Sequence, residues 1–139
     1  MLQLFITIQE QLQKINPENL ILPTGEVNEN DTVVGVITDL EQQKLFTLAR
    51  SMQRDSKIAM AHIGVSIGEE KAAHERQCLE LQHKGDVAMN VFWAILKDKH
   101  SLWNEDSIGI RDGWKVVKID LSAQKRLHAE LAHALFASM

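Results

Sequence analysis

The chain has 139 residues and a net charge of −4, with 45% hydrophobic and 24% charged residues. These proportions are typical of a globular protein and exclude collagen-like, proline-rich and wholly disordered classes. One cysteine, Cys78, excludes an internal disulfide, and also excludes a four-cysteine zinc site or iron–sulfur cluster built from this chain alone. The length suits a single domain.

The N-terminal segment has no basic start and no continuous apolar core, so we expect no signal peptide. The longest nearly apolar run, residues 87–96, is far shorter than the about 20 residues that a bilayer requires. A lone thiol fits a reducing compartment. We therefore expect a cytoplasmic protein with no membrane partner.

Residues 2–15 fit a helix in their second half, whereas their first half alternates as a strand does, so both structures stay open. Asn16-Pro17 ends this element, and residues 16–32 form an acidic loop. The short β-branched segment 32–37 is a possible strand.

A capping box at Thr38-Asp39-Leu40-Glu41 predicts a helix start, with Thr38 as the capping residue. We therefore expect residues 1–37 to form an N-terminal helix or strand plus an acidic loop. Residues 38–139 should form a helical body with a hairpin, and the whole chain a single domain.

Residues 58–67 fit either a strand or a helix, and we choose a helix because its apolar stripe continues through residues 69–83. Gly64, Gly68 and Ala72 lie four residues apart on an adjoining strip, which hints at a tight helix crossing.

Lys84-Gly85 is a good helix end, and Asp86 is a good N-cap for a further helix over residues 87–99. That helix is apolar on nearly every side. We expect it to be the centre of a bundle or a subunit interface.

Asp112-Gly113 predicts a two-residue type I′ turn in a β-hairpin over about residues 107–118. Asp120 then caps a last helix, 121–137, which carries Leu127, Leu131 and Leu135 on one face. The expected fold is mainly α: a small bundle of about four helices with one hairpin between the last two.

Two Glu-x-x-His pairs, Glu80–His83 and Glu130–His133, have the spacing of metal ligands on one helix face. Surface ion pairs are the alternative, since Glu130 follows Arg126 by four residues and Glu80 lies on a polar side. We infer no resemblance to the ferritin-like family.

A second metal candidate is Glu70, His74 and Cys78, which continue an apolar helical stripe at intervals of four. A carboxylate, an imidazole and a thiolate could hold zinc with a fourth ligand from elsewhere. The alternative is a buried Glu–His pair beside a structural cysteine.

All three tryptophans, Trp93, Trp103 and Trp114, fall close together in the sequence. They either pack in the core or form a surface for a partner, where tryptophan is enriched. Arg111 and Trp114 flank the turn and would form an exposed cation–aromatic pair.

No converging catalytic set is present, and residues 111–126 are too weakly basic for us to expect a nucleic-acid partner. We predict a non-enzymatic interaction or assembly protein that binds itself, as a homo-oligomer, or another protein, with no cofactor. The alternative is a metal-binding helical bundle, or a metal-dependent enzyme, that uses the Glu and His pairs with a divalent metal such as Zn, Fe or Mn.

Overall fold

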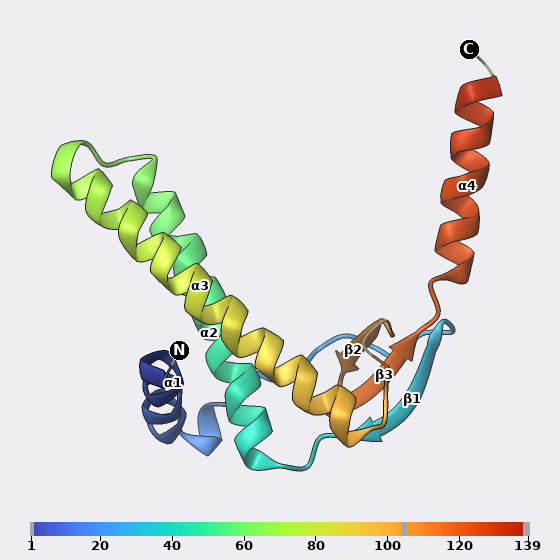
Figure 1. The fold of residues 1–139 in the computed structure, drawn as a ribbon, viewed down its shortest axis with the longest axis horizontal. Helices are drawn as coiled ribbons and strands as arrows, with labels where there is room; N and C mark the ends of the chain where they lie inside the picture. Colours follow the sequence, from blue (N-terminus) through green and yellow to red (C-terminus); the bar gives the residue numbers. More distant parts are fainter. Residues whose placement is uncertain (1, 104–105, 138–139) are drawn as a thin grey trace. The chain divides into compact units, whose positions relative to one another are not determined.

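The computed structural model describes residues 2–103 and 106–137 (Figure 1). The structure is 64% helical, and its described part contains four helices and one antiparallel sheet of three strands. A mainly helical fold with a hairpin between the last two helices is thereby confirmed. Contacts divide the chain into two compact units, which are residues 1–22 with 37–101 and residues 23–36 with 102–139.

The first unit is built around a long helical hairpin. Helices α2 (Leu40–Ile63) and α3 (Gly68–Lys99) run side by side, and α1 (Leu2–Gln13) packs on α2 (Figure 1). Residues 2–13 are thus a helix, which settles the alternative left open by their sequence.

The segment after α1 is largely irregular, as expected for residues 16–32. It contains one short 3-10 helix, η1 (Pro17–Asn19), which Asn16 caps by accepting a hydrogen bond from the Glu18 N–H at 2.9 Å. Further on, the buried Thr47 hydroxyl of α2 accepts a hydrogen bond from the Ile21 N–H at 3.0 Å. This bond attaches the segment to the helical hairpin.

The N-terminus of α2 is capped one residue later than its sequence predicts. Asp39 is the N-cap, and its Oδ1 accepts a hydrogen bond from the Glu41 N–H at 2.9 Å. The other carboxylate oxygen lies 3.2 Å from Lys99 Nζ. The capping role assigned to Thr38 is therefore wrong, because a carboxylate that also binds a lysine is a stronger acceptor than a hydroxyl.

The chain reverses direction where one continuous helix is predicted. The helix α2 ends at Ile63, Gly64 caps it, and α3 begins at Gly68 with a φ of 64°. Residues 58–63 are helical as predicted, but the helix does not continue through residues 64–67. Since Gly64 and Gly68 belong to the two sides of a turn, the predicted small-residue strip on one helix does not exist.

Gly85 lies in the middle of α3 and does not end a helix. A Cβ atom at this position would lie 3.2 Å from Met52 Cβ and 3.3 Å from Gln53 Cγ. The glycine is therefore needed where α3 passes close to α2. The predicted helix break between Gly85 and Asp86 is wrong because this tertiary contact outweighs the local capping signal.

The core of the first unit lies between the two long helices. The Phe46 and Phe92 rings are 5.4 Å apart, and Ala49, Phe92 and Leu96 are fully buried. Residues 87–99 are helical as predicted. However, Val91 on the outer side of this helix is 44% exposed, so the chain itself covers this stretch on only part of its surface.

The second unit contains the sheet, in the strand order β1-β3-β2. The predicted strand near residues 32–37 is confirmed as β1 (Asp31–Val36), and it pairs with β3 (Lys115–Ile119) with a bulge between Val33 and Gly35. The hairpin itself consists of β2 (Ile108–Arg111) and β3. Because β1 pairs with β3, residues 31–36 belong to the same compact unit as the hairpin, although they precede the long helices in the sequence. The expected division of the chain at residue 37/38 stays a prediction.

The turn of the hairpin is longer than predicted. Arg111 pairs with Lys115, which leaves three residues in the loop. The positive φ angles fall on Gly113 (76°) and Trp114 (61°), so the two-residue turn over Asp112-Gly113 is wrong. Tryptophan rarely adopts the left-handed backbone region, so Trp114 is strained at this position. The Trp114 residue is only 9% exposed, so the burial of its ring accompanies this backbone strain.

The last helix, α4 (Ser122–Ala137), begins as predicted, since Asp120 Oδ1 accepts a hydrogen bond from the Ser122 N–H at 2.9 Å. None of its residues is buried. No helix in the described part of the chain is long and apolar enough to cross a bilayer.

Candidate functional site

The predicted cluster of Glu70, His74 and Cys78 is only partly assembled. His74 Nε2 lies 3.8 Å from Glu70 Oε1, and the Glu70 side chain is 72% exposed. The ring of His74 also makes an edge contact with His62 of α2, with 5.2 Å between ring centroids. Sequence reasoning missed His62 because it belongs to a different helix, so no spacing along the chain relates it to His74.

Cys78 lies in the interface between the two long helices. It is 4% exposed, and its Sγ is 3.5 Å from Ser56 Oγ. The Ser56 hydroxyl also donates a hydrogen bond to the Cys78 carbonyl oxygen at 3.2 Å. This buried serine–cysteine contact is a packing arrangement between two small polar side chains.

The Glu-x-x-His pairs have different surroundings. Glu80 forms an ion pair with Lys84, with 3.0 Å between Oε1 and Nζ, and His83 is exposed beside it. Glu130 and His133 are exposed on α4. Across residues 2–103 and 106–137, no three His, Cys, Asp or Glu side chains gather closely enough to share a metal ion. The metal-binding alternative stays a prediction.

The three tryptophans do not share one environment. Trp93 is half-buried and its ring packs on the edge of Phe92, with centroids 5.3 Å apart. Trp103 is 75% exposed, whereas Trp114 is 9% exposed. The predicted exposed pair of Arg111 with Trp114 is therefore wrong, because one of its members is buried.

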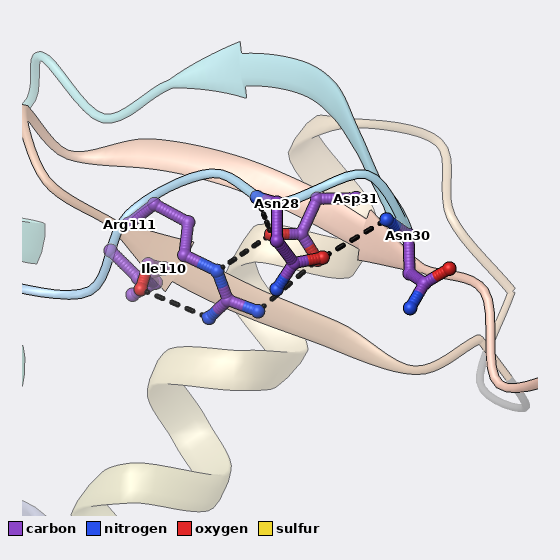
Figure 2. Close-up of polar contacts among 5 residues, drawn as sticks. All are labelled: Asn28, Asn30, Asp31, Ile110 and Arg111. Atoms are coloured by element: carbon purple, nitrogen blue, oxygen red, sulfur yellow. Dashed lines mark hydrogen bonds and ion pairs between the residues drawn. The ribbon is translucent and has the colours of Figure 1, made fainter. Parts of the chain in front are cut away.

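Arg111 instead binds Asp31 at the start of β1, as Figure 2 shows. Its Nε and Nη2 donate to the two carboxylate oxygens at 2.9 and 3.2 Å. The Asn28 N–H donates to Asp31 Oδ2 at 3.0 Å. These hydrogen bonds, that of Arg111 first, hold the pKa of Asp31 below its usual value of 3.8.

This ion pair fastens β1 to the hairpin. The side chain of Asp31 is fully enclosed and that of Arg111 is 20% exposed. The Asp112 N–H also donates to the Gly25 carbonyl oxygen at 2.7 Å. The segment before β1 is thereby held along the hairpin, and the guanidinium of Arg111 is engaged inside the unit.

An open hollow of about 600 Å³ lies beside the start of α4. Its charged residues are mostly engaged with their neighbours. Lys118 Nζ is 3.3 Å from Asp106 Oδ1. Asp120 has a pKa below its usual value because it accepts hydrogen bonds from the hydroxyl and the N–H of Ser122. This arrangement stabilises the end of the sheet and the start of α4.

The second unit exposes a leucine face on α4, which we define as Leu127, Leu131 and Leu135. These side chains are 52%, 59% and 62% exposed, and Phe136 nearby is 70% exposed. Their spacing of four residues places the leucines on one side of the helix. The sequence predicts this face, but its exposure follows only from the structure.

Among the described residues, the charged side chains of α4 form no ion pair with one another. The predicted surface ion pair of Arg126 with Glu130 is absent from the ion pairs among the described residues. The charge of Arg126 acts instead on Asp120, where it contributes to lowering the pKa of the carboxyl group. Glu130 is exposed.

Comparison of the chain with protein families, with curated proteins and with solved structures gave no match.

Proposed function

We propose that this protein is a small non-enzymatic interaction and assembly protein, and that it self-associates through α4. The observation that carries the proposal is the exposed leucine face on a helix without a single buried residue. A contiguous exposed apolar face marks an interaction surface more often than it marks ordinary solvent-facing surface.

The physics of helix formation supports the same proposal. An isolated helix of 16 residues is marginally stable in water, because most helical stability in proteins comes from packing an apolar face. Among its described residues α4 buries none, so its own chain supplies little of that stabilisation. Covering the leucine face with a second helix would supply it.

Helix α3 also carries exposed apolar side chains, but these lie twelve residues apart. Val91 and Leu79 are 44% and 67% exposed, and they lie on a helix whose inner side is occupied by α2. We assign the primary contact to α4 because its three leucines form one regular stripe. We also place the protein in the cytoplasm, since Cys78 is a free buried thiol.

The test is the molar mass in solution, measured by static light scattering over a wide range of protein concentration. The proposal expects a mass that rises from that of one chain toward that of two. A matched variant with all three leucines of the face changed to Gln should remain a single chain. A wild-type protein that keeps the mass of one chain at its highest soluble concentration would overturn the proposal.

A further inference from the structure

We draw no further inference here: the strongest candidate, the exposed leucine face of α4, carries nothing beyond the proposed function because nothing in the structure shows what covers it.

Discussion

Changing Leu131 to Ala separates the role of α4 in association from its role in folding. In the monomer the Leu131 side chain is 59% exposed, so more than half of it is available for burial in a dimer. Full burial of a leucine contributes roughly 1.5–3 kcal/mol, so this site contributes about 1–2 kcal/mol in each copy. Two copies lose about 2–4 kcal/mol, which weakens the dimer by about one and a half to three powers of ten.

The same substitution should leave the folded monomer nearly unchanged. An exposed position changes the free energy of unfolding by less than about 0.5 kcal/mol, and alanine is the better helix former. The matched control is His133→Ala, two residues further along α4. It is also exposed but lies away from the leucine face, so it should leave the dissociation constant unaltered.

Sedimentation equilibrium gives the dissociation constants, and urea unfolding of dilute protein gives the free energy of unfolding. Equal dissociation constants for Leu131→Ala and His133→Ala would refute the role of the leucine face. A loss of more than about 1 kcal/mol in the unfolding of the dilute Leu131→Ala monomer would also refute the reasoning, because α4 would then be packed on its own chain.

Three further predictions concern the two units themselves. Gly85→Val should lower the free energy of unfolding in urea by about 1–3 kcal/mol, because the new side chain would overlap Met52. The control Gly64→Ala should not lower the urea midpoint, because Gly64 has an ordinary helical φ of −68° and room for a Cβ atom. The lowered pKa of Asp31 stabilises the fold fully above pH 3.8, and this contribution is lost as the pH falls through the lower pKa of the folded state; Asp31→Asn, which cannot ionise beside Arg111, should therefore show a shallower fall of the urea midpoint below pH 3.8 than the wild type. Protein purified without a histidine tag should contain no stoichiometric Zn, Fe or Mn by elemental analysis, and a metal present in equal number to the chains would favour the metal-binding alternative.

Local signals in the sequence predicted the elements better than their connections. The hairpin, the capping role of Asp120 and the helical nature of residues 87–99 follow from neighbouring residues alone. The turn at residues 64–67 was missed because Ile63 and Ile67 keep the spacing of the apolar helical stripe across it. At Gly85 the local pattern of a helix end was overruled by the close passage of α2.

Contacts between distant parts of the chain were beyond the reach of the sequence. The pairing of β1 with β3 joins residues that lie 79 to 88 positions apart in the sequence. The ion pair of Asp31 with Arg111 depends on that pairing, so Arg111 was assigned to Trp114, its neighbour in sequence. Likewise, the contact of His62 with His74 depends on the helical hairpin.

The leucine face of α4 was likewise predictable from the sequence only in part. The spacing of Leu127, Leu131 and Leu135 showed that α4 has an apolar face, because helical periodicity is local. Whether that face is covered depends on the packing of the whole chain, which no single sequence window contains. The exposure of α4 is therefore the structural finding on which the functional account depends.

Hydrogen exchange across α4 tests that account most directly, because it reports on the helix itself. If pairing with a second copy stabilises α4, protection of the amides of residues 122–137 should rise steeply as the protein concentration increases, while the amides around Phe92 stay protected at all concentrations. Protection of α4 that does not change with concentration would contradict the central claim that this helix is stabilised by self-association.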